Sequence, residues 1–176
     1  MDNNEIDKIL KEKLKDKIKP SIELENKIKQ KIEEEKIAAG KAREEAMKAV
    51  IEEIEEEYPD AIKTDEGIYY EILKEGKGNP TGTGKNVAVE YKGYLPDGPI
   101  FDATKEFHPQ GHEPLEFTTA GGQMIPGFDL MVQEMKLGET RKMVIPPELA
   151  YGPYGIPQAG IPGNAYICFD VTLIKN

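Results

Sequence analysis

The chain contains 176 residues, of which 32% are charged, and its formal net charge is −10 at pH 7. This charge argues against a nucleic-acid partner, because phosphate binding needs clustered lysine and arginine. No apolar run approaches the roughly 20 residues of a membrane span. The single cysteine, Cys168, excludes an internal disulfide and is typical of a reducing compartment. We therefore expect a cytoplasmic protein with no nucleic-acid or membrane partner.

Residues 1–60 predict a charged helical arm, because apolar residues recur at steps of three and four. Pro20 predicts a break into two helices, since proline lacks the N–H that a helix interior needs. Ser21 can cap the second helix, Gly40 favours a bend because glycine costs about 1 kcal/mol relative to alanine, and Pro59 ends the arm. The apolar stripes are Ile6, Ile9, Leu10, Leu14 and Ile18, followed by Leu24, Ile28, Ile32, Ala39, Ala42, Ala46, Val50 and Ile54.

Stripes this narrow on so charged a helix cannot form a core alone. They must pack against each other, against a second subunit, against the rest of the chain or against a client protein. The alternative is a solvated helical spacer with no partner. We expect self-association, giving a homodimer through these helices, or contact with clients.

Residues 61–176 predict a second domain of α+β class, because the period of the pattern changes from helical to alternating. We expect an antiparallel twisted sheet wrapped on one short helix. Alternation of apolar and polar residues predicts half-buried strands. The predicted strands cover residues 68–74, 86–95, 100–102, 114–118, 142–145 and 166–174, and turn residues lie between them, as at Pro96–Pro99.

The stretch from Gly121 to Gly155 carries the short helix. A glycine-led turn presents Met124 and Ile125, and Pro126 takes the first helical position, where its missing N–H is not needed. Gly138 marks the C-terminal end of this helix. We expect these segments to gather Met124, Ile125, Phe128 and Tyr151 around an apolar hollow.

Common catalytic motifs are missing from the sequence. It has no G-x-S-x-G elbow, no phosphate-binding loop and no C-x-x-C. His108 and His112 are four residues apart, but Pro109 and Gly111 between them disfavour a metal-binding helix, so we expect a surface loop without metal. Aromatic side chains with few polar groups remain. Among these, the carboxylate of Asp102 and the hydroxyl of Tyr151 need hydrogen-bond partners.

The order of several motifs resembles the FKBP family of peptidyl-prolyl isomerases. These motifs are GQMIPGF at 122–128, MKLGE at 135–139 and IPPELAYG at 145–152, with a short helix between the first two. The resemblance covers roughly residues 66–176 and implies an isomerase that rotates X-Pro bonds in protein substrates and assists folding. It implies no cofactor, and it implies binding of macrolides such as tacrolimus or rapamycin. Some bacterial members carry N-terminal helical dimerisation arms.

The resemblance implies that a proline ring of the substrate docks among the aromatic side chains while the preceding amide is twisted. Tyr91, Phe101 and Phe128 would wall and floor the proline site. Asp102 and Tyr151 would orient the substrate backbone, and the N–H of Ile125 would donate to a substrate carbonyl. The remaining wall, rim and base would come from Met124, Leu115, Phe117, Ile156, Ile161 and Phe169.

The sequence departs from well-known members of the family at three places. Phe128 stands where tryptophan is frequent, Leu115 stands where an aromatic residue is common, and the loop 103–113 lacks the arginine present in some relatives. The first two changes make the pocket slightly looser, which affects affinity more than activity. The alternative to an enzyme is a catalytically weak binding or chaperone module with the same pocket.

Overall fold

The computed structural model describes the backbone of residues 3–96 and 98–176. Within the N-terminal helix it describes the side chains of Glu5, Glu12 and residues 23–57 other than 39, 43, 44, 46 and 47. Two compact units can be distinguished, one that ends at Glu53 and one that spans Ile54–Asn176. No helix among the described residues is long and apolar enough to cross a membrane.

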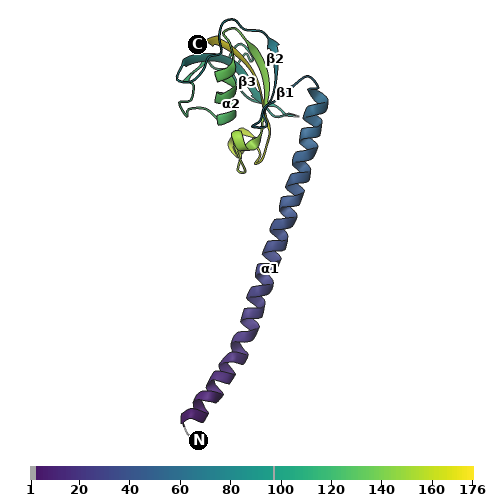
Figure 1. The fold of residues 1–176 in the computed structure, drawn as a ribbon, viewed down its shortest axis with the longest axis vertical. Helices are drawn as coiled ribbons and strands as arrows, with labels where there is room; N and C mark the ends of the chain where they lie inside the picture. Colours follow the sequence, from purple (N-terminus) through teal and green to yellow (C-terminus); the bar gives the residue numbers. More distant parts are fainter. Residues whose placement is uncertain (1–2, 97) are drawn as a thin grey trace. The chain divides into compact units, whose positions relative to one another are not determined.

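Helix α1 is continuous from Asn3 to Glu57 (Figure 1). The predicted break near Pro20 is therefore wrong, and Gly40 also lies inside the helix. Proline removes one backbone hydrogen bond and clashes with the preceding turn, but that cost is local. Lysine, glutamate, leucine and isoleucine on both sides have high or moderate helix propensity and continue the helix.

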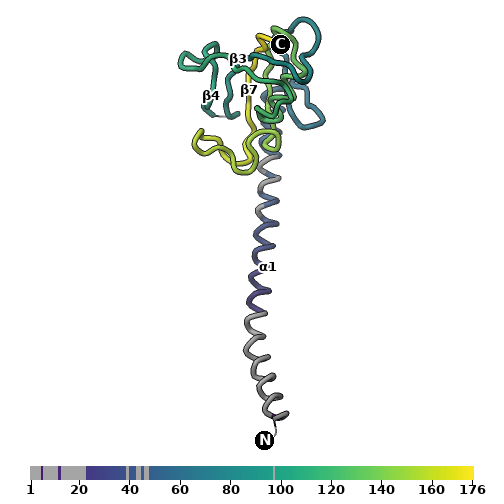
Figure 2. The backbone as a smooth tube through the Cα atoms, turned by 90° about the vertical axis from the view of Figure 1, so that its left-hand side faces the viewer, coloured from purple at the N-terminus to yellow at the C-terminus, as the bar shows by residue number. Residues whose placement is uncertain are grey.

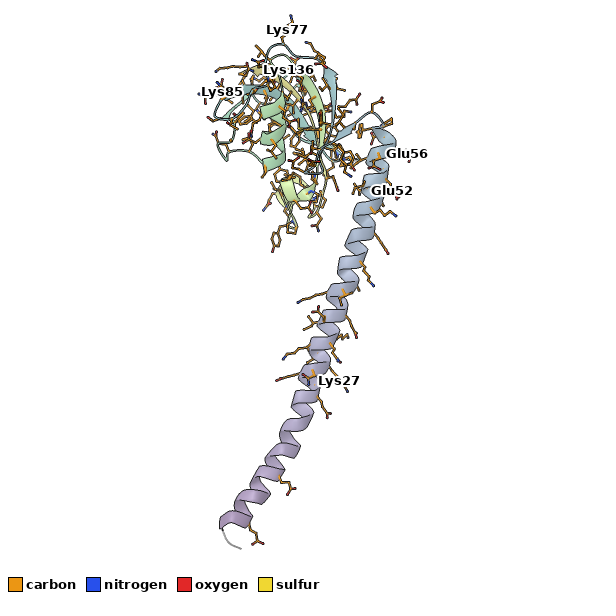
Figure 3. All side chains as sticks on the ribbon, viewed as in Figure 1. Lys27, Glu52, Glu56, Lys77, Lys85 and Lys136 are labelled. Carbon is orange, nitrogen blue, oxygen red and sulfur yellow. The ribbon has the colours of Figure 1, made fainter. Side chains whose placement is uncertain are left out.

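The first unit is a strongly solvated helix. Lys27 and Glu52 project outward from α1 (Figure 3), and Lys48 pairs with Glu52 at 3.7 Å. Three leucine and isoleucine residues of the predicted stripe at four-residue steps are about half exposed: Leu24 is 59% exposed, Ile28 50% and Ile32 46%. The first predicted stripe, together with Ala39 and Ala46, lies outside the described side chains.

The second unit contains a seven-stranded antiparallel sheet, which confirms the predicted α+β class. Its order is β1-β2-β6-β7-β3-β4, and β5 also pairs with β3. Figure 1 labels β1, β2 and β3 of this sheet, and Figure 2 labels β3, β4 and β7. The strands are β1 Ile62–Lys63, β2 Tyr69–Lys74, β3 Asn86–Tyr94, β4 Ile100–Ala103, β5 Leu115–Thr118, β6 Thr140–Ile145 and β7 Ile167–Lys175. Only β1 was not predicted, because two residues carry no periodicity. The predicted turn at 96–99 includes residue 97, which lies outside the described residues.

Helix α2, Pro126–Glu134, covers one face of this sheet (Figure 1). Its apolar side chains join the core with those of the central strands, including Met131 from the helix and Val171 from β7. Gly127 is required by this packing, because a Cβ there would lie 2.4 Å from Cγ2 of Ile145. Short 3-10 helices, η1 Pro147–Leu149 and η2 Pro157–Ala159, follow β6.

The opposite face of the sheet is also covered near β6 and β7. Val144 and Cys168 on that face are 2% and 0% exposed, so the prediction of half-buried strands is wrong here. Ile54, near the end of α1, is 1% exposed, and Tyr58, just after α1, lines a small hollow together with Val144. Ile54 therefore belongs to the core of the second unit, although its spacing placed it on the arm.

Candidate active site

An apolar pocket with a volume of about 360 Å³ lies in the second unit. Its lining comes from β3, β4, β5, β7, the start of α2 and the segments before α2 and after η1. The lining residues are Tyr91, Phe101, Asp102, Leu115, Gln123, Met124, Ile125, Phe128, Tyr151 and Phe169.

The walls of the pocket are aromatic rings that meet edge to face. Phe128 and Phe169 have ring centroids 5.0 Å apart, and Phe101 meets Phe169 at 6.2 Å and Tyr151 at 6.4 Å. Such perpendicular contacts add about 0.5–1.5 kcal/mol each beyond burial of area. Gly93 leaves room for two of these rings, because a Cβ there would lie 2.8 Å from both Phe101 and Phe169. The rings are therefore held by one another and by the sheet.

One carboxylate and two phenols provide most of the polarity of the pocket. The Tyr91 hydroxyl donates to Oδ2 of Asp102 at 2.5 Å. Burial, followed by the hydrogen bond to Asp102, raises the pKa of Tyr91 above its ordinary value. Burial and the nearby charge of Asp102 also raise the pKa of Tyr151. Both phenols are therefore neutral hydrogen-bond donors near neutral pH.

His112 reaches the same carboxylate from the loop after β4. Its Nε2 lies 3.3 Å from Oδ1 of Asp102 and 3.1 Å from the Tyr91 hydroxyl. The sequence predicted a surface loop for this histidine, and its side chain is indeed 44% exposed. Its contact with Asp102 was missed, because no local pattern says where a loop returns to its strand.

Two donors on residues that line the pocket have no partner within the described residues. The Tyr151 hydroxyl makes no hydrogen bond there, and the N–H of Ile125, just before α2, has no acceptor. The carbonyl of Ile125, by contrast, accepts from the N–H of Asp129 at 3.2 Å. A bound group with acceptor oxygens could therefore use both free donors.

Nine of the predicted site residues line the pocket, and three do not. Phe117 is 4% exposed and packs behind the wall, with its ring 6.0 Å from Phe128. Ile161 is 1% exposed in the core, and Ile156 packs beside it through two backbone hydrogen bonds. Gln123 lines the pocket without having been predicted. Its Oε1 accepts from the N–H of Thr118, so it also shapes the loop before α2.

A second hollow of about 300 Å³ shares Phe101 and Asp102 with the pocket. It is more polar, because His108, Gln110 and His112 contribute to its lining. Within residues 3–96 and 98–176, no three His, Cys, Asp or Glu side chains are arranged to hold a metal ion.

The family model for FKBP-type peptidyl-prolyl cis-trans isomerase matches residues 78–174, which contain all the lining residues of the pocket. FK506-binding protein 1 of Dictyostelium discoideum is 42% identical over 108 residues, covering 61% of this chain and 96% of that protein.

Longer relatives match over the same part of the chain. FK506-binding protein 4 of Aspergillus oryzae is 40% identical over 114 residues, which are 65% of this chain but 23% of that protein. The chain thus spans about a quarter of the length of this relative. Among solved structures, FkpA from Escherichia coli is similar with a TM-score of 0.62 and 31% identity, covering 99% of this chain and 73% of that one.

Proposed function

The chain belongs to the family of FKBP-type peptidyl-prolyl cis-trans isomerases, and on this premise we propose that it accelerates rotation about X-Pro bonds in polypeptides. The observation that carries the proposal is the aromatic pocket, which holds one carboxylate and free N–H and O–H donors at its wall. Its volume of about 360 Å³ lies within the range of about 300–1,000 Å³ found for small-ligand sites.

The reaction needs no covalent step. Resonance keeps the amide planar, and the barrier to rotation is about 18–20 kcal/mol. The planar amide is more dipolar than the twisted one, so water stabilises the ground state more than the transition state. An apolar pocket removes that water, and each 1.4 kcal/mol or so of preference for the twisted amide speeds rotation tenfold. The proline ring would lie against Phe128, with Tyr91 and Phe101 at the sides.

The polar groups would fix the substrate backbone on either side of the rotating bond. The free N–H of Ile125 would donate to one substrate carbonyl, and the hydroxyl of Tyr151 to another. Asp102 would hold Tyr91 and add its negative charge at the pocket wall, rather than act as a general acid. Met124, Leu115 and Phe169 would complete the contact surface, with Phe117, Ile156 and Ile161 supporting it from behind.

A peptide assay tests this proposal directly. The full chain should speed isomerisation of a short X-Pro peptide, and Phe101→Ala should reduce kcat/KM by at least tenfold. It should also speed the slow phase of refolding of a protein limited by proline isomerisation, which lasts tens of seconds without catalyst. Absence of activity on both substrates would refute the isomerase and leave a binding or chaperone module.

We also propose that α1 forms a homodimer through the stripe of Leu24, Ile28 and Ile32, with client contact as the alternative role. These side chains are exposed in the single chain and recur every four residues, which suits a helix pair. Sedimentation should give a dimer for the full chain and a monomer after Ile28→Lys with Ile32→Lys. A monomer for both, with slower refolding only for the variant, would favour client capture and a chaperone role.

Two further proposals follow from the family. Relatives are named FK506-binding proteins, and we propose that tacrolimus, which is FK506, and rapamycin occupy the same pocket and inhibit the peptide reaction. Competition between tacrolimus and the peptide would test this. A cytoplasmic location is supported by the single cysteine, Cys168, which is buried and unpaired.

A further inference from the structure

The side chain of His112 is placed by backbone hydrogen bonds to the end of β4. The backbone N–H of His112 donates to the carbonyl of Ala103 at 3.1 Å, and the backbone carbonyl of His112 accepts from the N–H of Lys105 at 2.8 Å. Gly111 permits this close return, because a Cβ there would lie 2.4 Å from the carbonyl of Thr104. The imidazole is thereby fixed beside Asp102, which lies in the same strand as Ala103.

The hydrogen bonds around this imidazole are satisfied together in only one protonation state. Nδ1 lies 2.6 Å from the carbonyl oxygen of Glu113, an acceptor, so Nδ1 must carry a proton. Nε2 lies 3.1 Å from the hydroxyl oxygen of Tyr91, within hydrogen-bond geometry, and 3.3 Å from Oδ1 of Asp102, so a proton on Nε2 faces acceptor oxygens on both sides. The hydroxyl of Tyr91 donates its single proton to Oδ2 of Asp102, so toward Nε2 it can only accept, and Nε2 must supply the proton of that hydrogen bond.

Each neutral form of the ring breaks one of these contacts. With a proton on Nδ1 alone, the lone pair of Nε2 faces the carboxylate and competes with Asp102 for the proton of Tyr91. With a proton on Nε2 alone, the lone pair of Nδ1 faces the carbonyl of Glu113. The imidazolium donates to the carbonyl of Glu113 and to the Tyr91 hydroxyl, and it places its positive charge beside the carboxylate of Asp102.

We propose that His112 is a positioning residue for Asp102 and Tyr91, and that it does so in its protonated form. The proposal rests on the isomerase function given above. Asp102 and Tyr91 line the pocket, whereas His112 lines only the hollow behind Asp102, so it acts through them. Loss of its proton removes the donor to the Tyr91 hydroxyl and the positive charge beside Asp102, and it loosens the pair that faces the substrate. The isomerase is therefore faster at mildly acidic pH than at alkaline pH.

The charged and titratable groups around His112 are few. The carboxylate of Asp102 faces the imidazole from β4, and the ring of Tyr91 faces it from β3. On its own loop, Glu113 forms an ion pair with Lys105, and His108 lines the same hollow. Tyr151 lies near Asp102 across the pocket and is neutral in this pH range. The carboxylate of Asp102 is thus the charge that His112 meets directly.

Activity against pH separates this role from a merely structural one. Histidine ordinarily changes charge between about pH 5 and 8. The kcat/KM of the full chain for an X-Pro peptide should fall about threefold to tenfold from pH 5.5 to 8.5, the size expected for one partly exposed charge-assisted bond. His112→Ala should give a flat profile at the lower value, and His112→Arg, always charged, a flat profile at the higher one. His108→Ala, in the same loop, should keep the wild-type profile.

The nitrogen resonances of the two imidazoles provide a readout that does not need activity. In the 15N-labelled full chain at pH 5.5, both nitrogens of His112 should carry protons, and Asp102→Asn should shift the resonances of His112 but not those of His108. The same profile in His112→Ala as in wild type, or resonances of His112 that ignore Asp102→Asn, would overturn the proposal. An inactive wild-type chain would instead refute the isomerase function, while the resonances would still decide whether His112 pairs with Asp102.

Discussion

The backbone N–H of Ala120 donates to both carboxylate oxygens of Asp129, at 2.9 Å to each. Ala120 has a positive φ of 57° in the loop before α2, and Asp129 is a 6% exposed residue in the first turn of that helix. The amide of Gln133 also donates to Asp129 at 2.9 Å. The carboxylate therefore joins α2 to the loop that carries Met124 and Ile125 into the pocket.

Asp129→Ala should loosen this loop. We expect unfolding to become easier by about 2 kcal/mol, since a buried hydrogen bond to a charged group is lost, and kcat/KM on an X-Pro peptide to fall about tenfold because Ile125 is no longer held. Urea unfolding and the peptide assay measure the two effects. Leu130→Ala, a 38% exposed neighbour on the same helix, is the control and should change neither much. Lower stability with unchanged kcat/KM would show that other contacts hold the loop.

Asp102→Ala should lower kcat/KM about tenfold with little change in stability. The carboxylate holds Tyr91 and faces the pocket, but its side chain is 48% exposed, so the fold does not depend on it. The peptide assay and thermal unfolding measure these effects. Asp65→Ala removes an exposed carboxylate that does not line the pocket and serves as the control. Full activity in Asp102→Ala would remove this residue from the mechanism.

Glu139→Ala should destabilise the second unit by about 3 kcal/mol, because the buried guanidinium of Arg141 then loses its buried partner and keeps Glu134, which is 59% exposed and lies 3.5 Å away. The side chains of Glu139 and Arg141 are 1% and 4% exposed and lie 2.7 Å apart, and the guanidinium also stacks on Tyr70 at 4.5 Å. Glu116→Ala breaks an exposed pair with Lys175 and should cost about 0–1 kcal/mol. Urea unfolding compares them. Equal effects for the two variants would contradict a structural role for the buried pair.

Stability should fall as pH rises above about 9, partly because of Cys168. Burial raises the pKa of its thiol to about 12 from an ordinary 9.0. Between these values the folded chain keeps a proton that the unfolded chain loses, so stability declines by up to about 1.4 kcal/mol per pH unit. Urea unfolding from pH 8 to 10 should show a shallower decline for Cys168→Ala than for wild type. Identical slopes would mean that the thiol does not titrate differently on folding.

Ile54→Ala should cost about 2–4 kcal/mol, as expected for a fully buried isoleucine. Leu73→Ala, at a 49% exposed leucine of β2, should stay within about 0.5 kcal/mol. Urea unfolding of the two variants gives the comparison. An effect of Ile54→Ala as small as that of Leu73→Ala would mean that the end of α1 is dispensable for the second unit.

The sheet and the pocket could largely be predicted because their signals are local. Strands alternate every second residue, and proline and glycine mark their ends, so β2 to β7 are found close to their predicted bounds. Helix α2 begins at Pro126 as predicted but ends at Glu134, before Gly138. The motif around Met124 to Phe128 and the pair Phe101–Asp102 also identified most of the lining. Pro20 does not end α1, because the helix propensity of its neighbours outweighs the local cost of one proline.

The remaining features depend on which distant segments meet. Ile54 repeats at helical spacing like the exposed Ile32, yet only Ile54 is buried in the core of the second unit. Phe117 and Ile161 have the same apolar character as the lining residues but lie behind them. His112 meets Asp102 only because its loop returns to β4. The sequence by itself determined the strands, the short helix and the chemistry of the pocket, since these follow from periodicity and residue type. Tertiary structure alone decided burial and the partner of His112, because both arise from contacts between residues far apart in the chain.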